Sequence, residues 1–353
     1  MVRRLCIRSG IRAITLGLLT FIIGITISLM GQWLNLPKAV AVPAVPNANP
    51  SQAPSIAPVL QISFSPTSPQ LGDTLQVLIR RSHQTNTLSL SPAPQITWDK
   101  KVYPAFLLKS GSSTGNDRNG KSGDIDNDIK NNGVRNVYVW RALIPTTPLD
   151  VPGPKQLVIN HGESPHPEIN FTLSNREFPT QSLWIDESGN SLEPTDAEWD
   201  QVSAFKKIVT PQKMWQGKFL RPNEGEVTTG FGVRRYYNGV FATDYYHRGV
   251  DYGGGYGSPV IAPAAGVVRL VGHADQGFRL HGNTVGIDHG QGVLSIFLHL
   301  SKITVQPGES VVAGQIIGEV GSTGAATGPH LHWGLYVQGE SVDPAPWRYG
   351  DIE

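Results

Sequence analysis

Short apolar segments, each closed by glycine or proline, are the feature that most restricts how this chain can fold. The 353 residues include 39 glycines and 27 prolines, which leave few uninterrupted stretches for helices. Within many segments apolar and polar residues alternate, as at Leu60, Ile62 and Phe64, and this is the period of a strand with one buried face. The pattern predicts an all-β protein.

A first group of strands is expected between residues 59 and 175, where their number and spacing favour an immunoglobulin-like β-sandwich. The polar run from 110 to 136 is predicted to be a disordered insertion. This part contains no cluster of chemically active residues, which favours a spacing or positioning role. The expected strands lie at 60–64, 75–79, 87–91, 96–98, 106–108, 137–143, 156–159 and 169–173.

Residues 176–221 are predicted to form a connector with one helix of about three turns. Thr195 and Glu198 have the spacing of a capping box. Trp199, Val202 and Phe205 follow as an apolar stripe, which we expect to dock on the next domain. That domain, residues 222–347, is predicted to be almost entirely β. Its clearest strands are expected at 267–271, 284–288, 294–298, 315–320 and 332–337.

The first 41 residues are predicted to be a signal peptide or a membrane anchor. Four arginines precede an apolar stretch at 13–30, which would span about 27 Å as a helix at 1.5 Å per residue. The basic N-terminal side places the rest of the chain outside the cytoplasm, in the periplasm or cell envelope. Ala39-Val40-Ala41 offers a cleavage site, so a cleaved leader and a retained anchor both stay open. The Pro-rich segment 42–58 is expected to be an extended linker.

Cysteine content and charge exclude several functional classes. Cys6 is the only cysteine and precedes the apolar stretch, so it cannot be a lipid-modified residue after a cleavage site, and no disulfide framework exists. The 29 basic and 28 acidic residues leave a formal charge of +1, without the basic excess that nucleic-acid binding requires. Nucleic acid is therefore not an expected partner.

Two short histidine clusters carry the candidate chemistry. One contains His247 and Asp251, and the other is His330-Leu331-His332. Histidine nitrogens and carboxylate oxygens are metal ligands, and three of them with one open position are typical of a catalytic zinc site. Gly249 lies between His247 and Asp251 and argues against a helix there, so a strand entered from a turn is expected. Spacing alone does not decide whether His330 or His332 binds the metal.

Further short motifs surround the two histidine clusters between residues 228 and 347. In chain order they are Thr229-Gly230-Phe231-Gly232, His247-Arg248-Gly249-Val250-Asp251-Tyr252, Gly257-Ser258-Pro259-Val260, Gly266-Val267-Val268, Ile287-Asp288-His289-Gly290, His299-Leu300 and the run from Gly321 that ends in His330-Leu331-His332-Trp333. With these motifs, residues 228–347 resemble the M23 metallopeptidase family, the lysostaphin and LytM type of peptidoglycan endopeptidase. One departure is Phe297, where the family usually has a tyrosine.

The resemblance implies a curved antiparallel sheet crossed by a groove, with one Zn²⁺ per chain. His247, Asp251 and His332 become the zinc ligands, while His330 and His299 become the catalytic pair that handles protons. His330 would act as general base, and His299 would donate to the carbonyl oxygen as it gains negative charge.

Other histidines of this region are expected to lie outside the site. His273 and His281 fall in the polar stretch 272–283, which is predicted to be a solvated hairpin loop. His289 is expected to have a structural role at a strand end.

The function predicted from the sequence is an extracytoplasmic zinc endopeptidase that cuts peptide cross-bridges of peptidoglycan in wall remodelling or daughter-cell separation. Its expected partners are peptidoglycan, the membrane if the N-terminal segment is retained, and divisome or cell-wall proteins. The alternative is a non-catalytic LytM-type activator of a cell-wall amidase. Members of that kind have lost zinc ligands, whereas this chain has a complete set.

Overall fold

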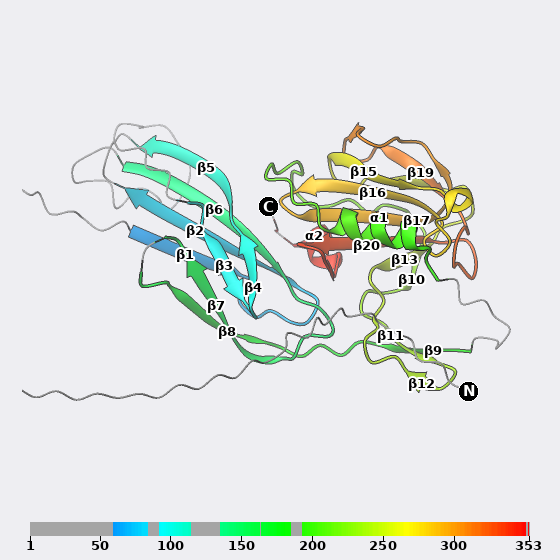
Figure 1. Ribbon diagram of the computed structural model, residues 1–353, viewed down its shortest axis with the longest axis horizontal. Coiled ribbons are helices and arrows are strands. Elements are labelled where there is room, and N and C mark those ends of the chain that lie inside the picture. The colour runs from blue at the N-terminus through cyan, green and yellow to red at the C-terminus, as the bar shows by residue number, and fades with distance from the viewer. Residues whose placement is uncertain are drawn as a thin grey trace, which may run out of the picture. The chain divides into compact units, whose positions relative to one another are not determined.

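The computed structural model describes residues 59–83, 92–113, 135–162, 164–184, 193–350 and 352. The predicted leader (1–41), the linker (42–58) and the expected strand at 87–91 lie outside these ranges. Within them, no helix is both long and apolar enough to cross a bilayer. The described chain is mostly β-sheet with few helices, as Figure 1 shows, and this confirms the predicted predominance of β-structure.

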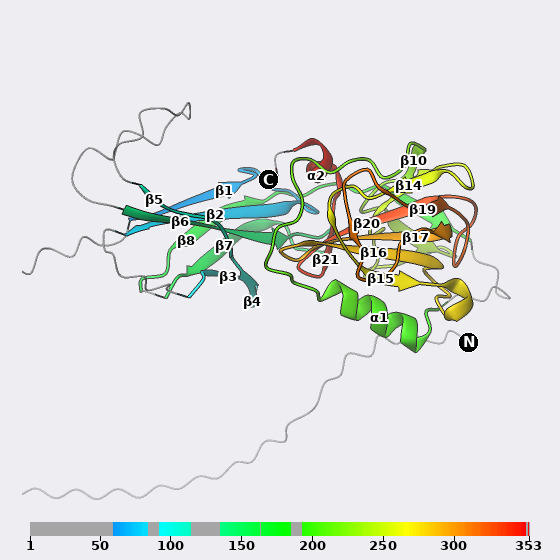
Figure 2. The ribbon, with the colours of Figure 1, turned by 90° about the horizontal axis from the view of Figure 1, so that it is seen from above.

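The described residues between 59 and 173 form two four-stranded antiparallel sheets around one core (Figures 1 and 2). Their orders, β1-β2-β6-β5 and β4-β3-β7-β8, match the ABED and C′CFG orders of immunoglobulin-type sandwiches. The first sheet consists of β1 (Val59–Ser65), β2 (Thr74–His83), β5 (Phe106–Ser113) and β6 (Arg135–Pro145), and the second of β3 (Gln95–Trp98), β4 (Lys101–Pro104), β7 (Gly153–Asn160) and β8 (Glu168–Leu173).

Strand alternation accounts for the core of this sandwich. Leu75, Val77 and Ile79 share one face of β2 and are fully buried, opposite Ile96 and Leu157 of the second sheet. The predicted disordered insertion was too long at both ends. β5 continues to residue 113 and β6 begins at 135, where the two strands pair. Of the predicted insertion, residues 114–134 lie outside the described ranges.

The connector contains the predicted helix, α1 (Asp196–Lys206), and its capping box is formed. Val202 and Phe205 are buried against the following domain, as expected, but Trp199 is 62 % exposed and does not belong to the buried stripe. The connector also contains an unpredicted strand, β9 (Thr180–Leu183), which pairs in parallel with β11 (Arg234–Tyr237). β12 (Val240–Phe241) completes this small sheet.

A ten-stranded antiparallel sheet forms the C-terminal domain, and its main path runs β10-β13-β20-β17-β16-β15-β18. The five strands expected from the sequence are all present within it. A 3-10 turn (Ala274–Gln276) and a short helix, α2 (Ala345–Tyr349), complete the domain. The strands are β10 (Glu226–Thr229), β13 (Val250–Gly253), β14 (Pro259–Ile261), β15 (Gly266–Gly272), β16 (Asn283–Gly290), β17 (Val293–Ile303), β18 (Ser310–Val311), β19 (Ile316–Val320), β20 (Leu331–Val337) and β21 (Glu340–Val342).

The sandwich contributes side chains to the core of the C-terminal domain. Leu143 of β6 is fully buried in the same apolar cluster as Trp215 and Trp347. Arg141, also on β6, is fully buried, donates a hydrogen bond to the side chain of Gln291 and lies 4.7 Å over the ring of Trp215. Burial lowers the pKa of Arg141 to about 10. The two domains therefore share part of one core.

Candidate metal centre

Two neighbouring strands bring the first and second histidine clusters together. β13 pairs antiparallel with β20, and Asp251 is the register partner of His332. His247 precedes β13 in an extended segment whose backbone bonds with Val233, in agreement with the expected strand entered from a turn. All three candidate ligands are less than 10 % exposed.

The three ligand atoms converge on one point. His247 Nε2 lies 3.1 Å from Asp251 Oδ1 and 3.1 Å from His332 Nδ1, and the last two atoms are 2.8 Å apart. Among the described residues, these side chains form a group able to share one ion. Tetrahedral ligands about 2.0–2.1 Å from zinc would be about 3.4 Å apart, so small side-chain adjustments would admit the metal. The donor set fits a metal ion.

A backbone contact fixes the tautomer of His247. Its Nδ1 lies 2.8 Å from the carbonyl oxygen of Gly230. Because a carbonyl only accepts hydrogen bonds, Nδ1 must carry the proton, and the lone pair of Nε2 then points at Asp251 and His332. An outer hydrogen bond of this kind is a regular feature of histidine ligands to metals.

The surroundings of Asp251 and His332 favour the protonation states in which these two side chains bind metal. Burial raises the pKa of Asp251, but the neighbouring His247 and His332 outweigh it and hold that pKa below its usual range. Burial lowers the pKa of His332, against the opposing effect of Asp251. A carboxylate anion and a neutral imidazole are the forms that bind metal.

His330 and His299, the predicted catalytic pair, lie beside this centre. Their rings are 4.8 Å apart, and His330 Nε2 is 4.0 Å from Asp251 Oδ1. His330 Nδ1 donates to the carbonyl oxygen of Gly328 at 2.9 Å, and His299 Nδ1 donates to that of Thr323 at 2.8 Å. In the neutral form of either ring, the remaining Nε2 is therefore a hydrogen-bond acceptor.

Burial lowers the pKa of His299 to about 3, and the nearby His332 and His330 add to the effect. This side chain is neutral at ordinary pH and presents an acceptor instead of the donor expected from the family resemblance. Donation by His299 to a carbonyl oxygen requires that the ring first take up a proton. Burial and the bond to Thr323 therefore favour His299 as an acceptor at rest.

The structure corrects the expectation for His281. This residue does not lie in a solvated loop, because its side chain is mostly buried and Nδ1 lies 2.7 Å from the carboxylate of Glu198 on α1. Sequence reasoning assigned Glu198 only to the helix cap and missed this contact. His289 has the structural surroundings expected of it, with Nδ1 at 2.9 Å from the Ala265 carbonyl and Nε2 at 2.9 Å from Ser295 Oγ.

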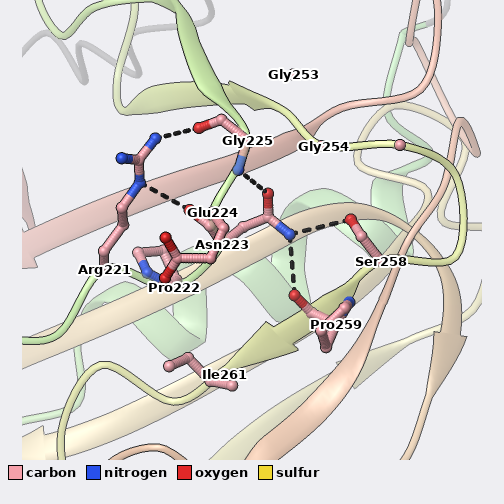
Figure 3. Close-up of a pocket in the computed structure, with 11 residues that line it drawn as sticks. Arg221, Pro222, Asn223, Glu224, Gly225, Gly253, Gly254, Ser258, Pro259 and Ile261 are labelled. Carbon is pink, nitrogen blue, oxygen red and sulfur yellow. Dashed lines mark hydrogen bonds between the residues drawn. The ribbon is translucent and has the colours of Figure 1, made fainter.

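A cavity of about 270 Å³ lies where the chain leaves Asp251, and Figure 3 shows its lining. Asn223 is buried there, and its amide donates to Ser258 Oγ and to the Pro259 carbonyl while accepting from the Gly225 N–H. A Cβ on Gly254 would lie 2.4 Å from Asn223 Oδ1, so the turn requires glycine. The polar groups of Asn223 are all hydrogen-bonded within the fold. Asn223 therefore stabilises the turn beside this cavity, and we do not assign the cavity as a second reaction centre.

Comparisons with known proteins agree with this geometry. Residues 245–344 match the sequence profile of Peptidase family M23. An uncharacterized metalloprotease of Haemophilus influenzae is 41 % identical over 98 residues, which are 28 % of this chain and 20 % of that protein. The peptidoglycan DD-endopeptidase ShyA of Vibrio cholerae is 42 % identical over 97 residues, 28 % of this chain and 22 % of its own length. The chain thus spans about a fifth of these curated relatives.

A crystal structure of a candidate M23 peptidase from Pseudomonas aeruginosa extends the likeness of fold. It covers 81 % of this chain and 96 % of its own, with a TM-score of 0.52 and 24 % identity. The fold and the His-Asp-His site define a domain of the metallopeptidase type. The chain carries a peptidase domain of family M23, which confirms the resemblance drawn from the sequence, and the matched residues include all five candidate site residues.

Proposed function

We propose that this protein is an extracytoplasmic zinc endopeptidase that hydrolyses peptide cross-bridges of peptidoglycan. The observation that carries the proposal is the convergence of His247 Nε2, Asp251 Oδ1 and His332 Nδ1 within 3.1 Å. The substrate class is brought from ShyA, which is named a peptidoglycan DD-endopeptidase. Wall remodelling or daughter-cell separation is the process in which such an activity would serve.

His247, Asp251 and His332 would hold the metal, and a set of two imidazoles and one carboxylate suits zinc. When bound, zinc supplies positive charge that acidifies water and polarises the peptide carbonyl. Asp251 contributes one negative charge, so the centre keeps a net positive charge. The Gly230 carbonyl keeps His247 in the tautomer that offers Nε2.

Proton transfer is assigned to His330 and His299, because each donates Nδ1–H to a backbone carbonyl and so offers Nε2 to the reaction. His330 takes a proton from the attacking water while the water oxygen forms its bond to the carbonyl carbon. The C–N bond then breaks, and the His330 imidazolium returns the proton to the leaving amine. His299 orients the water as a second acceptor, and it becomes a donor to the carbonyl oxygen only when its own ring is protonated.

The non-catalytic activator of a wall amidase is not favoured. Such a protein needs no metal ligands, whereas here all three ligand atoms are buried and converge and both auxiliary histidines adjoin them. The complete arrangement supports hydrolysis by this chain.

The remaining assignments concern position in the cell and domain roles. We propose residues 1–41 as a signal peptide or membrane anchor, 42–58 as a linker, 59–175 as an immunoglobulin-like spacer, 176–221 as the connector and 222–347 as the peptidase domain. Peptidoglycan is the partner, with the membrane added if the leader is retained, and divisome or cell-wall proteins are further candidates. The location is the periplasm or cell envelope.

Digestion of purified peptidoglycan sacculi tests the proposal. The full-length chain should release cross-bridge fragments that mass spectrometry identifies, and a chelator should stop the release until zinc is restored. His332→Ala should be inactive, while His273→Ala, which alters a histidine outside the site, should keep activity. Fragment release that persists in the chelator or in His332→Ala would refute the metal-dependent mechanism.

A further inference from the structure

The carboxylate of Glu198 on α1 is fully buried and accepts far more hydrogen bonds than a helix cap requires. It accepts from three consecutive backbone N–H groups, those of Arg279 (2.9 Å), Leu280 (3.1 Å) and His281 (2.8 Å). The ring Nδ1 of His281 donates as well, at 2.7 Å. Glu198 lies in the connector, outside the segment 245–344 that matches family M23.

These contacts stabilise a charge that burial alone would disfavour. Burial raises the pKa of Glu198, but the hydrogen bonds from His281 and Leu280 outweigh it, and the net pKa lies below the usual range. Capping needs only the bond from the Thr195 N–H to Glu198, at 3.3 Å. The other four donors all belong to the segment 279–281, so Glu198 mainly organises that segment.

Residues 279–283 support His299 in two ways. They contact its backbone directly, and they contact its ring through Thr323. The carbonyl oxygen of His281 accepts the backbone N–H of His299 at 3.0 Å. Thr323 accepts the ring Nδ1–H of His299 through its carbonyl, and its hydroxyl accepts from the N–H of Asn283 at 2.9 Å. A backbone bond from Ala325 to the carbonyl of Leu280 closes the assembly at 3.0 Å.

His299 needs such support because its backbone is strained. Its φ of 64° lies in the left-handed region, which side chains with a Cβ rarely adopt. Residues in such conformations persist only where their surroundings determine them fully. The bond to His281 holds the main chain of His299, and the bond to Thr323 holds its ring.

We propose that Glu198 is a positioning residue for His299. By holding the segment 279–281, it sets the backbone conformation of His299 and keeps the His299 ring beside His330 and His332. This inference rests on the proposed function for its catalytic consequence, and it makes helix α1 of the connector part of the working site. A purely structural Glu198 would affect folding without any specific dependence on His299.

A double-mutant cycle in the full-length chain tests the proposal. Glu198→Gln replaces the carboxylate with an amide, whose NH₂ group would face the N–H donors of segment 279–281. We expect kcat to fall about tenfold, which is the scale of one lost charge-assisted hydrogen bond. KM and zinc content should change little. In a His299→Ala background the same change should cost nothing further. Equal losses in both backgrounds would overturn the proposal.

Two further variants separate positioning from folding. Asp196→Asn removes the same charge from an exposed position in the first turn of the same helix, so activity should be unchanged. Should Glu198→Gln fail to fold, His281→Leu removes the ring donor from the loop side and leaves the cap of α1 intact. That variant should also slow turnover in the wild-type background only, and an equal loss in His299→Ala would contradict the proposal.

A readout independent of wall hydrolysis is the ring nitrogen NMR spectrum of His299, assigned by comparison with His299→Ala. The wild type should show a protonated Nδ1 and an unprotonated Nε2, and Glu198→Gln should mix the tautomers. An unchanged ring spectrum in Glu198→Gln would overturn the proposal even if activity fell. A wild type inactive on every sacculus preparation would instead count against the proposed function, while the spectrum still decides the role of Glu198.

Discussion

Asp251 and His332 face each other across two antiparallel strands, paired in register and with carboxylate Oδ1 2.8 Å from imidazole Nδ1. Both residues belong to strands of the ten-stranded sheet, and both are buried. Because the sheet itself sets this distance, the candidate centre exists without rearrangement of loops. Tests of the centre can therefore change one side chain at a time.

Replacing a ligand should remove the metal. Wild-type protein should bind about one zinc per chain. Loss of a residue that only hydrogen-bonds to a metal ligand weakens metal binding roughly 10–100-fold. Asp251→Asn removes a ligand itself, so its zinc affinity should fall by more than that. The reason is that the amide keeps the shape of the side chain but loses the charge and one strong ligand oxygen. Metal analysis after dialysis is the measurement, and His330→Ala, which is expected to retain zinc, is the control. Loss of zinc from His330→Ala would mean that the ligand assignment is wrong.

Glycine at position 249 is predicted to be necessary for the placement of His332. A Cβ there would lie 2.4 Å from the carbonyl oxygen of Trp333 and 2.8 Å from His332 Nε2. Gly249→Ala should therefore displace the ring and weaken zinc binding, measured by competition with a chelator. Gly255→Ala is the matched control, because nothing lies within 4 Å of its added Cβ. Equal zinc affinity of the two variants would contradict the placement.

Stability should fall in acid through His289. Burial lowers its pKa to about 4, whereas the unfolded chain titrates near 6.5. Between pH 4 and pH 6.5 the unfolded state binds a proton at His289 and the folded state does not. The free energy of unfolding should then drop as pH decreases from 6.5, by about 3 kcal/mol at pH 4 relative to pH 7.

Urea denaturation of the wild type and of His289→Gln at both pH values isolates this contribution. The variant loses the titrating group, so its free energy of unfolding should fall less than that of the wild type over the same interval. Parallel pH profiles for the two proteins would exclude His289 as the source.

Leu143 should stabilise the peptidase domain although it belongs to the sandwich. It is fully buried in the core cluster with Trp215 and Trp347, so Leu143→Ala should lower the free energy of unfolding by about 2–5 kcal/mol. Leu107→Ala, on the same sandwich but 46 % exposed, should have a much smaller effect. Urea unfolding followed by tryptophan fluorescence gives both values, and equal losses would argue against the shared core.

The sequence predicted the local elements well where one signal dominated. Alternation located the start of β2 and both ends of β16 within a residue or two, and Thr195 with Glu198 located the start of α1. β2 continues four residues beyond the expected end. The ligand set followed from residue types and the family resemblance, and the structure brings those atoms together. Its assignment as a zinc site stays a prediction.

Contacts between distant segments could not be predicted. β9 is four residues of mixed polarity, Thr-Gln-Ser-Leu, and its pairing with β11 has no local signature. His281 lies between Leu280 and Gly282 in a glycine-punctuated stretch expected to be a loop, so nothing along the chain indicates that it contacts Glu198, 83 positions away. The same contact explains the error at Trp199, since the helix face bearing Glu198 turned inward and Trp199 stayed in solvent.

The position of Leu143 in the shared core also limits how the two domains can be separated during evolution. Recombination that joined the peptidase domain to a different N-terminal module would leave a gap where this side chain fills the core, and would expose the tryptophans around it. Gene fusions should therefore transfer the sandwich and the peptidase domain together, so that the pair behaves as one evolutionary unit.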